Sequence, residues 1–331
     1  MPSEKVYNWG IIGPGRIAHN FAEGLAVLPE AKLYAVASRS EQRARDFAEK
    51  YQVPFYYEGY DQILTNPDVD IIYVATPHTS HFADTIMCLE KGMPVLCEKP
   101  FTIHSNQLKK LVHTARSKKV FLMEAIWTRF LPTIEKVIEI RESGEFGKIK
   151  AVYADFGFYA PFDPESRLYN LDLGGGALLD IGIYPVFLSL LLLGKPVEIK
   201  AIADLSQTGS DESCSILCKY PVGQMANLAC TLAADTPIEA NIIFEKGRVK
   251  INRRWFMPSS LAITDSKDKT TELNFKYEGN GYHLEAREAM DCLSKNLTES
   301  RKLPLQFSLD LMELLDEIRN QCHIHYPGVD P

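Results

Sequence analysis

An aspartate and a tyrosine stand four residues apart in an otherwise apolar stretch that follows three glycines, Gly174-Gly175-Gly176. The stretch predicts a helix, on which Asp180 and Tyr184 would share one face. Both side chains can exchange protons, and both need partners if they are buried in so apolar a segment. Pro185 removes an N–H that would bond to the Ile181 carbonyl, so we expect the helix to kink or break there.

A lysine follows a short apolar strand in the string Leu96-Cys97-Glu98-Lys99-Pro100. The strand is expected to begin at Pro94, and its carboxyl end is the edge at which open α/β sheets bind ligands. Lys99 is either a site lysine or a surface cation. A Lys-Pro step that ends a strand can hold the ammonium group toward a bound nicotinamide.

A glycine fingerprint opens the chain's first helix. Gly13-Pro14-Gly15-Arg16-Ile17-Ala18 fits the pattern G-x-G-x-x-[GA] between a predicted strand and a predicted helix. Gly13 permits a tight turn, Gly15 lets a pyrophosphate approach the backbone, and Ala18 allows close packing of helix and strand. The helix N-terminus supplies N–H donors and partial positive charge. The motif predicts dinucleotide binding; a plain glycine turn is the alternative.

The end of the second strand indicates which dinucleotide binds. An NAD site usually carries an acid there, whereas this region reads Ala37-Ser38-Arg39-Ser40, with Arg43 one helical turn beyond. A hydroxyl from Ser38 and the guanidinium groups of Arg39 and Arg43 suit a 2′-phosphate, and Arg39 can also stack on adenine. The pattern favours NADP over NAD, with NAD left open.

Strand and helix patterns alternate over the first ~125 residues. Continuous apolar strands between amphipathic helices are typical of a parallel sheet covered on both faces. Residues 1–125 are therefore predicted to form a doubly wound α/β domain of the Rossmann type. Beyond it, strand-like runs between residues 148 and 252 are separated by tight turns, and two amphipathic helices follow. We expect residues 126–331 to form an α+β domain for substrate binding and oligomerisation, an open, mainly antiparallel sheet with helices on one face.

Composition excludes several other classes of protein. The chain has 331 residues and a formal net charge of -7, which argues against a nucleic-acid partner. No secretory signal pattern opens it, and the apolar run Pro185–Leu193 is too short to cross a bilayer. The seven cysteines form no C-x-x-C pair, which suits free thiols in the cytoplasm. No metal is expected, since His323-Ile324-His325 is the nearest approach to a ligand set.

Together these strings resemble the Gfo/Idh/MocA family of oxidoreductases over essentially the whole chain. The Glu98-Lys99-Pro100 step and the Asp-x-Gly-x-[His/Tyr] helix are the two signatures of that family. Most members have histidine where this chain has Tyr184. The tyrosine, the string from Val95 to Pro100 and the string from Phe121 to Phe130 match the branch formed by dimeric dihydrodiol dehydrogenases, which are also NADP-dependent D-xylose dehydrogenases.

The resemblance implies roles for individual residues. Tyr184 would be the general acid/base, with Lys99 beside it and Asp180 orienting the network. An aromatic substrate pocket would come from Trp127, Phe156 and Trp255. The remaining side chains expected to line the cofactor are Thr76, Pro77, His78, His81 and Glu98. A homodimer would form through the C-terminal sheet.

The activity expected from this resemblance is reversible hydride transfer between a nicotinamide and a secondary or hemiacetal hydroxyl of a sugar or trans-dihydrodiol. A free tyrosine titrates near 10, and a neighbouring ammonium such as Lys99 favours the phenolate. Three alternatives stay open: a reductase of another carbonyl or an imine, a non-catalytic NADP sensor, and an interaction protein that uses the exposed sheet. Retention of Lys99, Asp180 and Tyr184 argues against the sensor, which would need no proton-transfer set.

Overall fold

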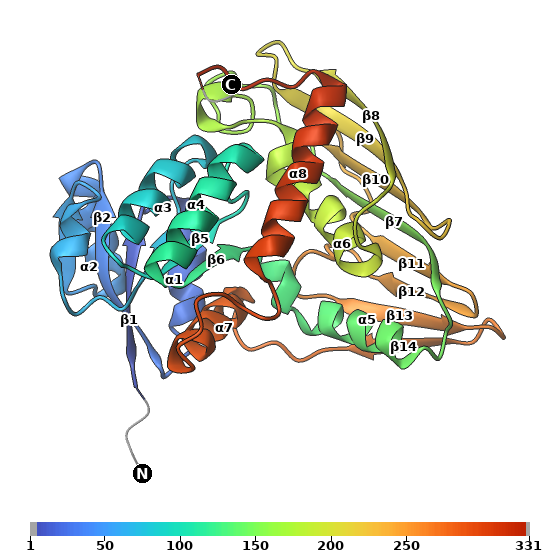
Figure 1. Ribbon diagram of the computed structural model, residues 1–331, viewed down its shortest axis with the longest axis horizontal. Coiled ribbons are helices and arrows are strands. Elements are labelled where there is room, and N and C mark those ends of the chain that lie inside the picture. Colours follow the sequence, from blue (N-terminus) through green and yellow to red (C-terminus); the bar gives the residue numbers. More distant parts are fainter. Residues whose placement is uncertain (1–4, 329–331) are drawn as a thin grey trace. The chain divides into compact units, whose positions relative to one another are not determined.

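The computed structural model describes residues 5–328, which divide into two compact units (Figure 1). The first contains residues 5–127 and Tyr277–Leu309, and the second contains Thr128–Lys276 and residues 310–328. We expected all residues beyond 125 to belong to the second domain. The segment Tyr277–Leu309 belongs to the first unit, which corrects that division. The reason is a long-range contact, in which the Asn280 side-chain amide donates to the Asn20 carbonyl at 2.7 Å.

The first unit is built on a parallel sheet of six strands in the order β3-β2-β1-β4-β5-β6. Its central strands are buried on both faces, as their unbroken apolar sequences predict. Helix α7 packs against α1, where Gly24 leaves no room for a side chain beside Tyr282 and His283. The elements are β1 (Tyr7–Ile12), α1 (Arg16–Leu25), β2 (Ala31–Ser38), α2 (Glu41–Tyr51), β3 (Phe55–Glu58), β4 (Ile71–Val74), α3 (His81–Glu90), β5 (Val95–Glu98), α4 (Ser105–Lys118), β6 (Leu122–Ala125) and α7 (Tyr282–Ser294).

The second unit carries an eight-stranded sheet in the order β14-β13-β12-β11-β7-β10-β9-β8. All its strand pairs are antiparallel except β7 with β10, which confirms the mainly antiparallel sheet. Helices α5 and α6 lie on one face of the sheet (Figure 1). The elements are α5 (Pro132–Ser143), β7 (Ile149–Gly157), α6 (Ile183–Leu193), β8 (Glu198–Leu205), β9 (Asp211–Lys219), β10 (Met225–Thr231), β11 (Ala240–Phe244), β12 (Gly247–Ile251), β13 (Ser260–Asp265) and β14 (Thr270–Asn274); α8 (Leu305–Cys322) begins in the first unit and ends in the second.

The helix expected around Asp180 and Tyr184 forms, but its start is not α-helical. Leu178–Gly182 is a π-helical turn, and α6 continues from it through Pro185 to Leu193. We expected Pro185 to kink or to break the helix. It does not break the helix, because α6 continues past Pro185 to Leu193. Its missing N–H coincides with the wider turn, a feature often found at functional sites. The α-helical spacing assumed between Asp180 and Tyr184 does not apply across this turn.

The helical stretch Leu171–Leu193, which includes this turn, is long and apolar enough to cross a membrane by length and composition alone. In the structure 89% of its most apolar window is buried inside the fold. Packing of α6 against β7 and β10 accounts for that burial. The stretch is thus the core helix of the second unit, consistent with the buried helix that was expected.

A buried aspartate holds the beginning of this helix. Asp211 at the start of β9 accepts a hydrogen bond from the Leu178 backbone N–H at 2.5 Å. Gly176 lies directly against the Asp211 carboxylate at a φ of +129°, so any side chain there would collide and be strained. Burial raises the pKa of Asp211 to about 7. Gly176 is therefore required by the close approach of β9 to the helix, whereas Gly175 lies against the backbone of Asn170.

Candidate active site

The glycine turn after β1 has the geometry that a pyrophosphate site needs. Gly13 has a φ of +86°, and a Cβ there would crowd Thr76 at 2.7 Å. At Gly15 the nearest atom that a Cβ would meet is the Ala75 carbonyl oxygen, 4.0 Å away, so the backbone is open on that side. Gly15 precedes α1, whose first N–H groups point toward the turn. Arg16 and Ile17 follow on the exposed part of the helix start. These residues fit a dinucleotide.

Positive charge gathers at the end of β2, as the sequence predicted. Ser38 is buried there, whereas Arg39 and Arg43 are exposed. Burial raises the pKa of Tyr60, and the charges of Arg39 and Arg43 act in the opposite direction, which places both guanidinium groups close to that ring. The Ser40 hydroxyl accepts from the Arg43 N–H and begins α2. This edge is suited to a phosphate rather than to an uncharged ribose.

The loops after β4 and β5 are tied together by one buried histidine. The two ring nitrogens of His81 lie 2.8 Å from the Thr76 carbonyl and 2.8 Å from the Pro100 carbonyl. Two acceptors suit an imidazolium, but burial outweighs them and lowers the pKa of His81 to about 4. The neutral ring can therefore donate to only one carbonyl at a time. His81 was expected to line the cofactor; the structure shows it fully buried, beneath the loops that would do so.

The other residues of these loops are placed as follows. The Thr76 hydroxyl donates to the Asp84 carboxylate at 2.7 Å, while Pro77 and His78 are partly exposed. Lys99 is partly exposed at the end of β5, and its backbone N–H donates to the Glu98 carboxylate at 3.2 Å. The other Glu98 oxygen accepts from the Tyr73 hydroxyl. Glu98 is buried between these two donors, and its contact with the cofactor stays a prediction.

In the second unit, Tyr184 belongs to a cluster of three aromatic rings. Its ring centroid lies 5.6 Å from that of Phe156 and 5.3 Å from that of Phe256, and those two phenylalanines stack at 4.0 Å. Phe156 points inward from β7, the central strand beneath α6. Tyr184 itself is 5% exposed. A phenol at an apolar wall is a suitable arrangement for a proton exchange that excludes bulk water.

An ion pair accompanies the tyrosine. The Arg167 guanidinium lies 3.1 Å from the Asp180 carboxylate, whose side chain is 8% exposed while that of Arg167 is 58% exposed. The pair thus runs from the buried helix start to the surface of the loop before it. The carboxylate was predicted to need a partner if buried, and the structure supplies this one.

One of the three expected pocket aromatics, Trp255, occupies another environment. Trp255 is completely buried, and its indole N–H donates to the Asp155 carbonyl at 2.9 Å, so it anchors a loop rather than lining a pocket. Its neighbour Phe256 takes the expected place beside Phe156. Trp127 lies in the first unit, where it stacks on Tyr282 at 4.3 Å and 5°. Phe156 is the expected residue that contacts Tyr184.

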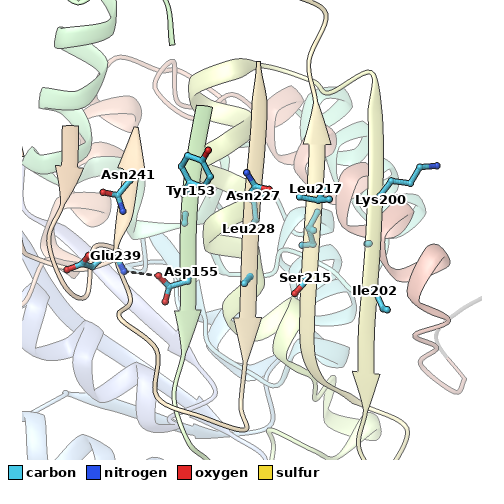
Figure 2. Close-up of a pocket in the computed structure, with 14 residues that line it drawn as sticks. Tyr153, Asp155, Lys200, Ile202, Ser215, Leu217, Asn227, Leu228, Glu239 and Asn241 are labelled. Carbon is cyan, nitrogen blue, oxygen red and sulfur yellow. Dashed lines mark hydrogen bonds between the residues drawn. The ribbon is translucent and has the colours of Figure 1, made fainter. Parts of the chain in front are cut away.

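A hollow of the second unit lies away from Tyr184. It has a volume of about 550 Å³ and lies on the outer face of the eight-stranded sheet, where Tyr153, Asp155 and Asn227 project from neighbouring strands (Figure 2). Phe156 points to the opposite face, because adjacent strand residues alternate. The hollow is therefore a surface feature separate from the tyrosine site. Within residues 5–328, no group of three His, Cys, Asp or Glu side chains has the arrangement of a metal site.

The family is decided by two matches along the chain. Residues 7–126 match the model described as oxidoreductase family, NAD-binding Rossmann fold. Residues 134–250 match the model of the GFO/IDH/MocA C-terminal domain. The chain belongs to the Gfo/Idh/MocA family of oxidoreductases. It is a nicotinamide-dependent dehydrogenase with a Rossmann domain, as the sequence predicted.

Individual members of the Gfo/Idh/MocA family resemble the chain along nearly all of its length. The trans-1,2-dihydrobenzene-1,2-diol dehydrogenase of Mus musculus is 36% identical over 96% of this chain and 98% of its own. The enzyme of that name from Homo sapiens is 33% identical over the same shares. Among solved structures, a 3-ketoreductase from Actinomadura kijaniata in complex with NADP and TDP-benzene has a TM-score of 0.86 at 27% identity, covering 96% of this chain and 98% of its own.

Sequence reasoning missed two members of this site. Phe256 follows Trp255 in a loop. Which of these two aromatic side chains packs beside Phe156 depends on the direction of the backbone, which the sequence does not show. Arg167 lies in an irregular segment with no periodic pattern. One signal was available for it: a buried Asp180 requires a cation or several donors, and arginine is the usual partner for a buried carboxylate.

The ion pair leads to a direct test in this family member. Replacing Arg167 by alanine removes the guanidinium that faces the Asp180 carboxylate at the start of the helix that carries Tyr184. We expect Arg167→Ala to lower kcat by about tenfold, equivalent to about 1.4 kcal/mol of activation free energy, and Arg167→Lys to lower it less. Steady-state dehydrogenase rates measure the effect, with thermal unfolding as a check on folding. An unchanged kcat in well-folded Arg167→Ala would show that the pair has no part in turnover.

Proposed function

We propose that this protein is an NADP-dependent dehydrogenase that oxidises a secondary or hemiacetal hydroxyl of a trans-dihydrodiol or an aldose. The observation that carries the proposal is the site around Tyr184, a phenol among the rings of Phe156 and Phe256 on the helix whose start carries the Asp180–Arg167 pair. The apolar rings suit stacking of a sugar or diol ring, and the polar pair suits its hydroxyl groups. The names of the diol dehydrogenases that resemble the whole chain support this substrate class.

Each residue has a defined task in this proposal. Tyr184 as phenolate takes the proton of the substrate hydroxyl and returns it in the reverse direction. Asp180, held by Arg167, fixes the helix start that carries the tyrosine. Lys99 has the role that the family resemblance gives it, a positive charge that favours a phenolate. The nicotinamide, when bound, accepts or donates the hydride. Because the reaction is reversible, the same set of residues serves a ketone reductase, the alternative that the 27%-identical 3-ketoreductase favours.

The preference for NADP rests on the edge of the sheet after β2. Arg39 and Arg43 are exposed there, and the sequence has no acid at the position that usually binds the ribose hydroxyls of NAD. The ketoreductase that resembles this chain was solved with NADP, whereas a levoglucosan dehydrogenase of similar fold, 16% identical with a TM-score of 0.88, was solved with NADH. This fold is found with either cofactor. In this proposal the charged side chains of Arg39 and Arg43 therefore select NADP over NAD.

A homodimer through the outer face of the eight-stranded sheet is part of this proposal. Ile202 is 74% exposed and Leu217 48% exposed, and both border the hollow that also contains Tyr153. Apolar side chains grouped on one flat face are typical of a protein interface. A second copy of the chain can cover such a face by symmetry, with each copy presenting the same strands.

The first experiment is a coupled absorbance assay at 340 nm. Purified protein is tested with NADP and with NAD against trans-dihydrodiols, D-xylose, D-glucose and inositol. We expect reduction of NADP with a diol or an aldose, and a loss of at least about a hundredfold in kcat for Tyr184→Phe, because the phenylalanine cannot take the proton. Full activity in Tyr184→Phe would disprove the assigned chemistry. A flat trace in the wild type together with tight NADPH binding would favour the sensor.

Cofactor choice is tested at Arg39. We expect Arg39→Ala to lower kcat/KM for NADP by about ten- to a hundredfold, because one charge-assisted contact to a phosphate is lost, and to leave kcat/KM for NAD within about twofold. Arg45→Ala is the matched control, since Arg45 is also exposed, on the helix α2 that follows Arg39, and pairs with Glu41 at 2.7 Å. Equal losses for NADP and NAD would contradict the assigned contact with the 2′-phosphate.

Sedimentation velocity tests the dimer. A charge at the centre of an apolar interface is costly, so Leu217→Glu should shift the protein to monomers at micromolar concentration. Val222→Glu serves as control, because Val222 is 69% exposed in the turn between β9 and β10 and does not border the hollow. A wild-type protein that sediments as a monomer, or a Leu217→Glu variant that stays dimeric, would exclude this interface.

A further inference from the structure

The C-terminal segment, residues 323–328, contacts the glycine run Gly174–Gly176 that opens the helix of the tyrosine site. Tyr326 in this segment is buried, and its hydroxyl donates to the Gly175 carbonyl at 2.9 Å. The bond joins residues 151 positions apart, and Figure 1 shows the segment after α8 close to the loop that precedes α6. A phenylalanine would fill the same space without the bond, so the hydroxyl serves the contact with the backbone.

Arg319 on α8 holds this segment in turn. Its guanidinium lies over the Tyr326 ring, 5.1 Å from the centroid, and pairs with the Asp316 carboxylate at 3.2 Å. Arg319 is buried, and a cation over a ring is attracted more strongly where water is excluded. The Arg319 carbonyl accepts from the Ile324 N–H at 3.0 Å, and the Ile324 side chain is buried as well. Tyr326 is thus held in place on its own side of the contact.

The glycine run is closely surrounded where it meets the phenol. Gly176 lies against the Asp211 carboxylate, and a Cβ there would also come within 3.2 Å of the Tyr326 hydroxyl. Gly175 has no room for a Cβ either, because the Asn170 backbone lies 2.9 Å from that position. Asp211 from β9 and Tyr326 from the C-terminal segment therefore hold these two glycines between them.

Gly176 is bonded next to both members of the ion pair at the helix start. Its carbonyl accepts from the Asp180 N–H at 3.3 Å, and its N–H donates at 2.8 Å to the carbonyl of Leu168, the residue after Arg167. A shift of Gly176 would therefore change the separation between the Asp180 carboxylate and the Arg167 guanidinium, which is 3.1 Å. The helix that begins here carries Tyr184. The position of the glycine run thus determines how the ion pair forms.

We propose that Tyr326 is a positioning residue for the dehydrogenase reaction, because its hydroxyl holds the glycine run that keeps Asp180 opposite Arg167. Tyr326 takes no part in the proton transfer. Its effect reaches the reaction through the start of the helix that carries Tyr184, and a displacement of about 1 Å at a catalytic group can cost up to about a hundredfold in rate. The inference rests on the proposed function in one respect, namely that Tyr184 transfers the proton.

Hydrogen exchange followed by mass spectrometry tests the contact without substrate or cofactor. Tyr326→Phe keeps the ring and removes only the donor to the Gly175 carbonyl. We expect the backbone amides of residues 174–182 to exchange about fivefold faster than in wild type, because one buried hydrogen bond is lost. Tyr220→Phe is the matched control, since Tyr220 is an equally buried phenol beyond the opposite end of β9 from Asp211. Unchanged exchange in Tyr326→Phe, or the same increase in Tyr220→Phe, would overturn the proposal.

Steady-state kinetics separates positioning from a purely structural role. We expect Tyr326→Phe to lower kcat about three- to tenfold and to leave the Kd for NADPH within about twofold of the wild-type value. Tyr220→Phe should leave kcat unchanged. Faster exchange in Tyr326→Phe with an unchanged kcat would overturn the positioning role. A wild type that turns over none of the substrates contradicts the proposed function itself, and the exchange experiment still decides whether Tyr326 holds the glycine run.

A double-mutant cycle with Arg167→Ala tests the route of the effect. Once the guanidinium is gone, the Tyr326 hydroxyl has no ion pair left to position. We expect kcat of the double variant Arg167→Ala/Tyr326→Phe to lie within about twofold of that of Arg167→Ala alone. Losses that multiply in the double variant would show that the two side chains act independently, which would overturn the proposal.

Discussion

The contacts between three strand-end loops determine what the first unit can bind. Gly13 after β1 lies against Thr76 after β4, and His81 connects the Thr76 carbonyl to the Pro100 carbonyl after β5. A parallel sheet brings these carboxyl ends to one edge, but the loops themselves are irregular and need side chains to hold them. The neutral, buried imidazole of His81 holds the loops after β4 and β5 together. The Gly13–Thr76 contact and His81 thus join the glycine turn to the loops after β4 and β5, the second of which follows Lys99.

Local patterns were sufficient for the parts of the fold whose strands are buried on both sides. The glycine fingerprint, the Glu98-Lys99-Pro100 step and the alternation of strands with helices each depend on neighbours within a few residues. Strand β3 was missed because three of its four residues are exposed, so no apolar run marks it. Strand β14 is an edge strand with the same character. The packing of α7 on α1 joins residues about 260 apart, and no local pattern records that contact.

Site residues could be predicted where their chemistry and their spacing stand out in the sequence. They could not be predicted where the direction of a side chain determines which residue enters the site. Asp180 and Tyr184 stand out because they are polar residues in an apolar stretch. The π-helical turn between them was not visible, since it depends on how Pro185 is accommodated. Trp255 and Phe256 are equally aromatic, and only the hydrogen bond to the Asp155 carbonyl shows which of them is turned into the core. His81 and Glu98 were recognised from their motifs, but the contacts by which they hold the loops after β4 and β5 join residues apart in sequence and were not visible.

Asp155 joins the two faces of the large sheet. Its carboxylate projects into the outer hollow and accepts the backbone N–H groups of Ile238 and Glu239 (Figure 2). Its carbonyl oxygen holds Trp255, which precedes the Phe256 ring stacked on Phe156. Occupancy of the outer face is thus connected through one residue to the shape of the wall beside Tyr184. In the proposed homodimer, assembly and substrate selection would consequently depend on each other through Asp155, and a natural variant at the outer face would be expected to change both.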